Sequence, residues 1–209
     1  LSRSLLVQVA KNKELYEQRF SRGLPLGGLK KLGPTQNRRG TSVTFHADSE
    51  IFGKHQFKPA RLFKSIRSKA YLFSGVEIRW KSAIDDGQTP KLATFHFPGG
   101  LSDYLMETLN GATTYSEKPF RGAVDFQERF QTPGKVEWAI NWTPSRDGFI
   151  QSYCNTVATP EGGTHEVGFW AAILKGIRAY GELLNNKKAK DISREDLLSG
   201  GCALVSCFI

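Results

Sequence analysis

Two short segments carry residue types that could hold a nucleotide or move a proton. Residues 160–164 (PEGGT) directly precede His165, Glu166 and a long segment with an apolar stripe. Amides at the start of a helix attract anions, so this turn could cradle a phosphate, and His165 beside Glu166 could exchange a proton. Residues 38–43 (RRGTSV) could set a hydroxyl group and bare backbone against a flat ligand.

Neither segment is a complete site by its sequence. The chain has no GxxxxGK[ST] or GxGxxG phosphate-binding sequence, no GxSxG nucleophile elbow, and no HExxH metal spacing. Its histidines are scattered: His46, His55, His96 and His165. A strand-to-helix turn at 160–164 and a strand start at 40–43 are the structural alternatives. The residues alone favour a protein with no catalytic residues and no metal site of its own.

Composition narrows the class of protein. With 209 residues, 39% of them hydrophobic, the chain can form one large domain or two modest ones. A formal net charge of +9 favours a polyanionic partner such as DNA. No apolar stretch approaches the ~20 residues that cross a bilayer, so we expect a cytoplasmic protein without a membrane partner. Cys154, Cys202 and Cys207 show no CxxC spacing and are expected to be buried thiols in a reducing cytosol, with a disulfide or a zinc site as the alternative.

Apolar periodicity predicts short strands around one helix in the first half. Residues 5–9 and 15–20 should form a hairpin, and the alternation at 41–48 (TSVTFHAD) indicates a half-buried strand. A helix is expected from Pro59, with an apolar stripe of Leu62, Phe63, Ile66, Ala70 and Phe73. Its basic residues are either a solvated face or a DNA-contacting face: Lys58, Arg61, Lys64, Arg67 and Lys69. Strands at 76–80 and 92–97 follow.

The residue pattern of the second half predicts a β-sheet packed against helices. A helix at 101–109 is expected, with Ser102 as its N-cap, and strands are expected at 122–130, 136–142 and 149–157, as an antiparallel sheet packed on helices by one face. Alternation in the middle strand should place four apolar residues on one face: Val136, Trp138, Ile140 and Trp142. Thr164 should cap the longest helix, whose buried stripe would be Phe169, Ala172, Ile173, Ile177, Tyr180 and Leu184. A short helix at 193–198 and a strand at 203–209 complete the pattern. Strand-like residues at both ends suggest an internal piece of a longer chain.

Five segments in series resemble the B subunits of bacterial DNA topoisomerase IV, type IIA topoisomerases whose close relatives are the gyrase B subunits. The segments are RRGTSVTFHAD, FKPARLFKSIRSKAYLFSGVEIRW, FPGGLSDYLMETLNG with EKPF, VEWAINW, and SYCNTVATPEGGTHEVGFWAA. Their order and spacing match along nearly the whole chain. The PEGGTH-like and Gly-Thr segments are shared with gyrase B, which remains the alternative within the family.

The resemblance implies an α+β fold with two domains. Residues 1–97 would be the C-terminal part of a GHKL-type ATPase domain, and residues 98–209 a transducer domain of the ribosomal-protein-S5-domain-2-like fold. Gly40, Thr41 and Val43 would border the adenine of ATP. Residues 160–164 would position the main transducer helix, and Lys175 and Arg178 on that helix would face DNA.

The resemblance also implies what the chain lacks. In the family, the glutamate that activates water, the asparagine that holds Mg²⁺ and the lysine that reaches the γ-phosphate lie outside this segment. ATP and Mg²⁺ would therefore act in the parent enzyme, with none bound and no turnover by this chain alone. The parent's partners would be the A subunit of topoisomerase IV, double-stranded DNA and a second B subunit. A stand-alone basic nucleic-acid-binding module is the alternative function.

Overall fold

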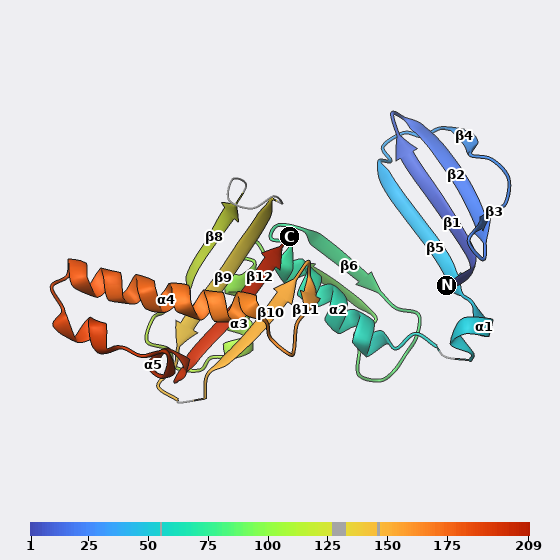
Figure 1. Ribbon diagram of the computed structural model, residues 1–209. Coiled ribbons are helices and arrows are strands. Elements are labelled where there is room, and N and C mark those ends of the chain that lie inside the picture. Colours follow the sequence, from blue (N-terminus) through green and yellow to red (C-terminus); the bar gives the residue numbers. More distant parts are fainter. Residues whose placement is uncertain (55, 127–132, 146) are drawn as a thin grey trace. The chain divides into compact units, whose positions relative to one another are not determined.

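The computed structural model describes residues 1–54, 56–126, 133–145 and 147–209, so His55 and the predicted strand end at 127–130 lie outside it. The chain divides into two compact units, Leu1–Lys58 and Pro59–Ile209 (Figure 1). This division reflects which residues pack against one another. The boundary expected between residues 97 and 98 separates two functional domains, and it stays a prediction.

The first unit is an antiparallel sheet followed by one short helix. The elements are β1 (Ser2–Lys11), β2 (Glu14–Ser21), β3 (Leu24–Pro25), β4 (Lys30–Pro34), β5 (Gly40–Ala47) and α1 (Ser49–Phe52). The strand order is β3-β2-β1-β5, and β4 also pairs with β2. Asn12 and Lys13 both have positive φ, as a two-residue hairpin turn requires. The predicted hairpin is confirmed.

The two faces of this sheet differ in chemistry. Leu5, Val7 and Val9 of β1 lie directly opposite Phe45, Val43 and Thr41 of β5, which gives one largely apolar face. Val43 is 58% exposed and Phe45 is 50% exposed, so the expected half-burial of β5 is wrong. The strand itself is confirmed. Burial fails because α1, the helix described in this unit, is only four residues long.

The second unit begins with α2 (Pro59–Leu72) and the hairpin of β6 (Glu77–Lys81) and β7 (Leu92–His96). Ala70 is buried as expected, and Tyr71 and Leu72 are buried beside it. The predicted stripe is wrong at Leu62 and Phe73, which are 40% and 44% exposed. Burial gathers at the last turn because this end of α2 packs toward α3 (Leu101–Leu109).

Two residues of the expected basic face of α2 have structural partners. Arg67 forms an ion pair with Glu107 of α3. Lys69 donates a hydrogen bond of 2.9 Å from Nζ to the carbonyl oxygen of Thr156. These two side chains join α2 to other elements of its own unit. The other three basic residues are exposed: Lys58, Arg61 and Lys64. For these three, both predicted alternatives stay open, a solvated face and a DNA-contacting face.

A mixed five-stranded sheet forms the centre of the second unit. Its strands are β8 (Phe120–Phe126), β9 (Gly134–Trp142), β10 (Phe149–Cys154), β11 (Val157–Ala158) and β12 (Gly201–Phe208), in the order β11-β10-β12-β9-β8. The β10 and β12 strands are parallel, so the predicted all-antiparallel sheet is wrong. A parallel pair needs a crossover, and the segment containing the longest helix supplies it.

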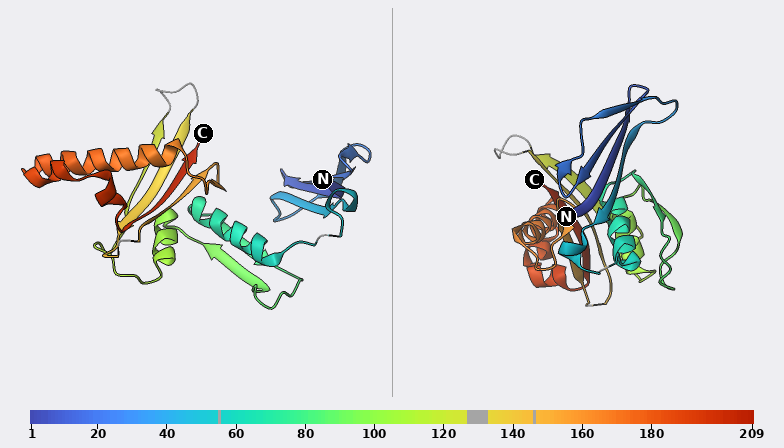
Figure 2. Two further views of the ribbon diagram at one scale, coloured as in Figure 1. Left: turned by 60° about the horizontal axis from the view of Figure 1, so that its bottom comes forward. Right: turned by 90° about the vertical axis from the view of Figure 1, so that its right-hand side faces the viewer.

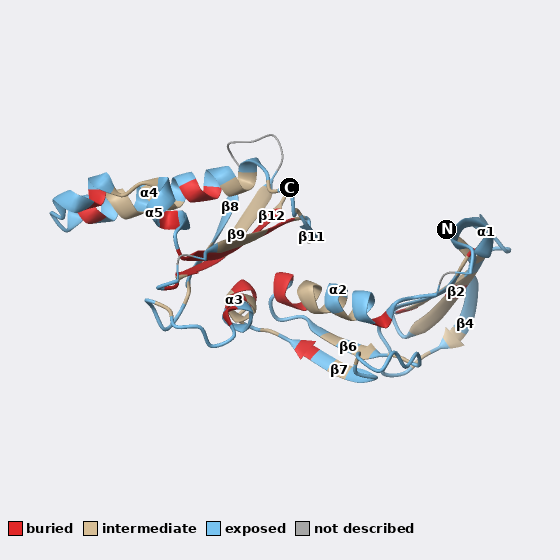
Figure 3. Ribbon diagram, turned by 90° about the horizontal axis from the view of Figure 1, so that it is seen from below, coloured by how far each residue is buried: buried red, intermediate tan, exposed pale blue. Residues whose placement is uncertain are grey.

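Helices cover both faces of this sheet, where the sequence predicted one (Figures 1 and 2). Leu101, Leu105 and Leu109 of α3 pack on one face. Phe169 and Trp170 of α4 (Thr164–Leu183) and Leu197 of α5 (Arg194–Leu198) pack on the other. The central strand β12 lies between them and is buried along nearly its whole length (Figure 3).

Helix starts differ from the expected caps. Gly100 and Gly163, rather than Ser102 and Thr164, occupy the N-cap positions of α3 and α4. The end of α3 is as predicted, with Asn110 in the left-handed conformation. A 3-10 helix, Lys187–Asp191, connects α4 to α5, where Ser193 and Asp196 form a capping box.

Candidate functional site

The expected adenine-side residues lie together at the start of β5. Gly40 has φ 114°, a backbone conformation that favours glycine, and pairs with Ala10 of β1. Thr41 and Val43 follow on the apolar face, opposite Val9 and Val7. This gives an open wall of aliphatic and aromatic carbon with a hydroxyl group at one end. Contact of this wall with a nucleotide stays a prediction.

Glu17, an acidic residue on the neighbouring strand β2, lies on the opposite face of the sheet, because it pairs with Gln8 of β1. Glu17 of β2 accepts hydrogen bonds of 2.9 Å from Gln8 Nε2 and 2.8 Å from Arg19 Nε. The Gln8 bond, and then the Arg19 bond, lower the pKa of Glu17 below its usual value. Arg38 Nη2 donates to Gln8 at 3.2 Å. Glu17 is therefore held ionised as an acceptor and does not face the apolar wall.

The turn before α4 is tied to the sheet by side chains. The Ser152 hydroxyl of β10 donates to the Glu166 carboxylate, and it is also hydrogen-bonded to Thr159 Oγ1. Thr159 Oγ1 lies 3.2 Å from His165 Nε2. These four residues form what we call the α4 latch. His165 and Glu166, which the sequence suggested as an acid/base pair, are used here to hold the start of the helix.

The backbone of the turn before α4 also forms hydrogen bonds within the turn. Gly162 has φ 72°, which allows the sharp reversal before the helix. Its amide donates to the Thr159 carbonyl oxygen at 2.9 Å, and the Glu166 amide donates to the Gly163 carbonyl oxygen at 3.1 Å. These two amides are paired within the turn. The geometry therefore accounts for residues 160–164 as a strand-to-helix turn, and the phosphate cradle stays an alternative prediction.

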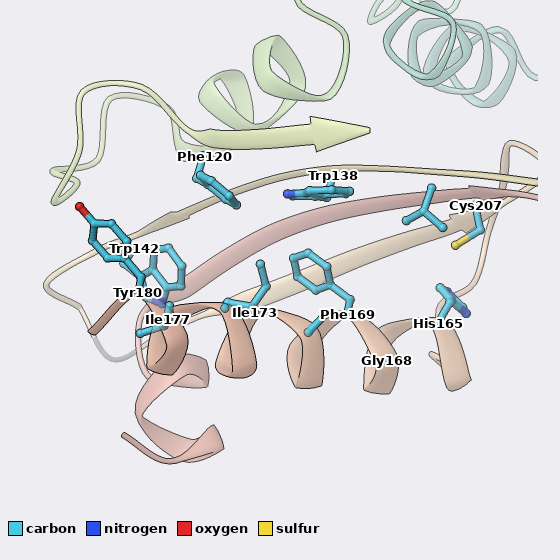
Figure 4. Close-up of a pocket in the computed structure, with 13 residues that line it drawn as sticks. Phe120, Trp138, Trp142, His165, Gly168, Phe169, Ile173, Ile177, Tyr180 and Cys207 are labelled. Carbon is cyan, nitrogen blue, oxygen red and sulfur yellow. The ribbon is translucent and has the colours of Figure 1, made fainter. Parts of the chain in front are cut away.

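An apolar groove of about 930 Å³ runs between α4 and strands β8, β9 and β12 (Figure 4). Phe120, Trp138 and Trp142 form its sheet side, and Phe169 and Ile173 project from α4. The indole nitrogen of Trp138 is buried, and none of the described residues offers it a hydrogen-bond partner. Sequence patterning predicted the apolar faces of β9 and α4, but not that a groove remains between them.

The comparisons with known proteins decide the family. A family model described as DNA gyrase B matches residues 100–209, which is more than half of the chain. The chain belongs to the DNA gyrase B family.

Curated relatives of this gyrase B family chain match its whole length. The DNA topoisomerase 4 B subunit of Caulobacter vibrioides is 49% identical over 100% of the chain, and that of Bartonella bacilliformis is 45% identical over the same share. The chain spans 30% of the length of each relative. The resemblance to topoisomerase IV B subunits is therefore confirmed at the level of sequence.

Solved structures of the gyrase B family share the fold. The 43K ATPase domain of Thermus thermophilus gyrase B, in complex with an aminocoumarin, has a TM-score of 0.85 and 29% identity, covering 100% of this chain and 56% of that one. The topoisomerase IV ATP-binding domain of Francisella tularensis has a TM-score of 0.74 at 23% identity, covering 100% and 55%. The chain thus has the fold of part of an ATPase domain.

The two expected DNA-facing residues of this gyrase B family member differ in their surroundings. Lys175 is exposed on α4. Arg178 is half-buried, and its Nε donates to the Ile192 carbonyl oxygen at 3.0 Å. Arg178 therefore anchors the segment after α4, and DNA contact stays a prediction for both residues. Within the described ranges, no helix is long and apolar enough to span a membrane.

Proposed function

We propose that this chain is part of the ATP-binding subunit of a type II DNA topoisomerase, which couples ATP binding and hydrolysis to DNA strand passage. One observation carries the proposal: the whole chain aligns, at 49% and 45% identity, with proteins named as B subunits of DNA topoisomerase 4. In this proposal residues 1–97 border the nucleotide and residues 98–209 are the transducer domain.

The apolar wall of β5 fits the base of a nucleotide better than its phosphates. Val43 and Phe45 are 58% and 50% exposed and offer a flat apolar surface, and the Thr41 hydroxyl can hydrogen-bond the edge of a heterocycle. In the part of the chain that the structure describes, no cluster of three potential metal ligands occurs. Mg²⁺ and the phosphates of ATP would be held by residues elsewhere in the subunit. Bound ATP would supply the free energy that drives the cycle.

In the proposed subunit, α4 would transmit the nucleotide signal. The α4 latch fixes its first turn to β10, and Arg178 fixes its second half to Ile192. Because Phe169 and Trp170 also pack on the sheet, the helix moves with the sheet rather than independently. The partners in this proposal are the A subunit of topoisomerase IV, double-stranded DNA and a second B subunit, in the cytoplasm.

Replacement of Thr41 tests the nucleotide contact. Thr41→Ala in the full-length subunit should raise the dissociation constant for a non-hydrolysable ATP analogue with Mg²⁺ about three- to tenfold, the value of roughly one hydrogen bond. Thr44→Ala is the matched control, because Thr44 is an exposed residue of the same strand that faces the other side. Calorimetric titration measures both variants. Equal affinities for Thr41→Ala and the unmodified protein would contradict the proposed adenine contact.

Replacement of Lys175 tests the DNA-facing role of α4. If Lys175 neutralises one phosphate, Lys175→Gln in the full-length subunit should reduce the slope of log K against log salt by about 1. Fluorescence anisotropy with duplex DNA over a salt series measures this slope. Glu182→Gln, a change on the same helix that removes a negative charge, should leave the slope unchanged. An unchanged slope for Lys175→Gln would mean that this side chain is only solvated.

A further inference from the structure

Two cysteines are paired across neighbouring strands of the mixed sheet. Cys154, the last residue of β10, lies directly beside Cys207 of β12 in the parallel register. Paired residues of adjacent strands project to the same face, so the thiols are neighbours. Strands in a sheet lie about 4.8 Å apart. This spacing falls within the range of roughly 4.4–6.8 Å between Cα atoms that disulfides span.

Both thiols lie on the α4 side of the sheet. Cys207 belongs to the apolar cluster beneath α4 and lines the groove, at the end where His165 also lies (Figure 4). Ser152, two residues before Cys154 on the same face, donates to Glu166 of α4. Cys202, by contrast, packs with Leu105 on the α3 side. The three free thiols are therefore one adjacent pair and one isolated residue.

The strand ends that carry the pair are held in register. The side-chain amide of Asn155 donates from Nδ2 to the Ile209 carbonyl oxygen and accepts from the Ile209 amide, both at 3.2 Å. The Asn155 backbone amide donates to the Cys207 carbonyl oxygen at 2.8 Å. These three bonds fix the spacing immediately after Cys154. A disulfide here would need little movement of the backbone.

The two thiols differ in exposure, which suits two different roles. Cys154 is half-buried, so the expected burial is wrong for this residue and a small oxidant can reach it. Cys207 is 7% exposed. Burial first, and the neighbouring Cys154 second, raise the pKa of Cys207, so this thiol stays protonated at neutral pH. Cys154 is the residue to be oxidised first, and Cys207 the residue to resolve it.

We propose that Cys154 and Cys207 are a peroxide-responsive dithiol that closes reversibly to a disulfide at the base of α4. The Cys154 thiolate attacks one oxygen of the peroxide, breaking the O–O bond and giving a sulfenic acid and hydroxide, which takes up a proton. The Cys207 sulfur then attacks the sulfenic sulfur, a second water leaves, and the S–S bond forms. Two thiols and one peroxide thus yield one disulfide and two waters, and a dithiol reductant reverses the change.

Peptide mapping of the full chain tests this proposal. After purification under reducing conditions and exposure to hydrogen peroxide, we expect one cross-linked peptide pair that joins Cys154 to Cys207, a mass lower by two hydrogen atoms, and full recovery with dithiothreitol. Cys202 should remain alkylatable throughout. A cross-link to Cys202, or sulfinic acid at Cys154 while Cys207 still reacts with an alkylating reagent, would overturn the proposal.

Two matched variants separate the roles of the thiols. Cys207→Ser should leave Cys154 as a sulfenic acid that a dimedone probe captures, whereas Cys202→Ser should form the disulfide in the same yield as the unmodified chain. The cross-link is first sought in the unmodified chain, whose result supports or overturns the proposal by itself. A variant that folds poorly therefore does not leave the proposal untested. The readout is independent of ATP and DNA, so its failure is distinguishable from failure of the proposed topoisomerase function.

Discussion

Trp170→Ala is expected to lower the free energy of unfolding of the second unit by about 3–5 kcal/mol, the cost of deleting a large buried aromatic side chain. Trp170 is 2% exposed and belongs to the cluster under α4. Its ring contacts Phe169 edge to face, with centroids 5.3 Å apart. Removing the indole leaves a cavity between α4 and the sheet that neighbouring side chains can fill only in part.

Urea denaturation followed by tryptophan fluorescence measures this effect. All four tryptophans lie in the second unit, so the signal reports on that unit and three of them remain in the variant. Tyr180→Ala is the control on the same helix, because Tyr180 is 63% exposed. Its effect should stay within about 0.5 kcal/mol. Equal losses for the two variants would contradict the packing described for α4.

The contrast between Trp170 and Tyr180 shows what helical periodicity can predict. The apolar stripe correctly predicted the existence of α4 and the partial burial of Ile173 and Ile177. It wrongly included Ala172, which is exposed, and Tyr180 and Leu184, which are 63% and 61% exposed. The C-terminal part of α4 extends past the strands in Figures 1 and 2, so it has no sheet to pack against. A periodic pattern cannot report where the neighbouring layer ends.

The sheet shows a similar limit. Alternation in β9 correctly placed Val136, Trp138 and Ile140 on one face. Pairing direction was missed, because the alternation of one strand does not identify its neighbours. One signal was present: residues 203–207 (ALVSC) are a nearly continuous apolar run, which is typical of a strand buried on both faces. β12 is that strand, and it lies between β10 and β9 at the centre of the sheet.

The candidate site was predictable only in part. The Gly40-Thr41 pair could be assigned to a strand start, and the structure places Thr41 and Val43 on one face of β5. The α4 latch was not predictable, because Ser152, Thr159 and Glu166 meet only when β10, the following turn and α4 fold together. The family resemblance supplied the adenine role of β5, which neither charge nor periodicity indicates.

Gly200→Ala should also destabilise the second unit, by about 2–5 kcal/mol. Gly200 has φ 75°, where an L side chain costs about 1–2 kcal/mol. A Cβ atom there would clash with the Thr143 carbonyl oxygen and would lie 2.6 Å from that of Ser145. Inserting an extra methyl group into a closely packed site costs about a further 1–3 kcal/mol. A backbone shift that relieved the clash would also disturb the 2.9 Å hydrogen bond from the Thr143 amide to the Gly200 carbonyl oxygen.

Gly176→Ala provides the opposite case in the same unit. Gly176 lies within α4, and apart from the neighbouring backbone of its own helix, a Cβ atom there would meet no heavy atom of the described residues within 4 Å. Alanine is the better helix former by roughly 0.5–1 kcal/mol, so this variant should be more stable than the unmodified chain. Denaturation midpoints in urea compare the two variants directly. The same substitution should therefore lower the free energy of unfolding at position 200 and raise it at position 176. At position 200 the close approach of other backbone segments requires glycine, whereas the space beside Gly176 accepts a methyl group. A loss of stability in both variants would contradict the open space described beside Gly176.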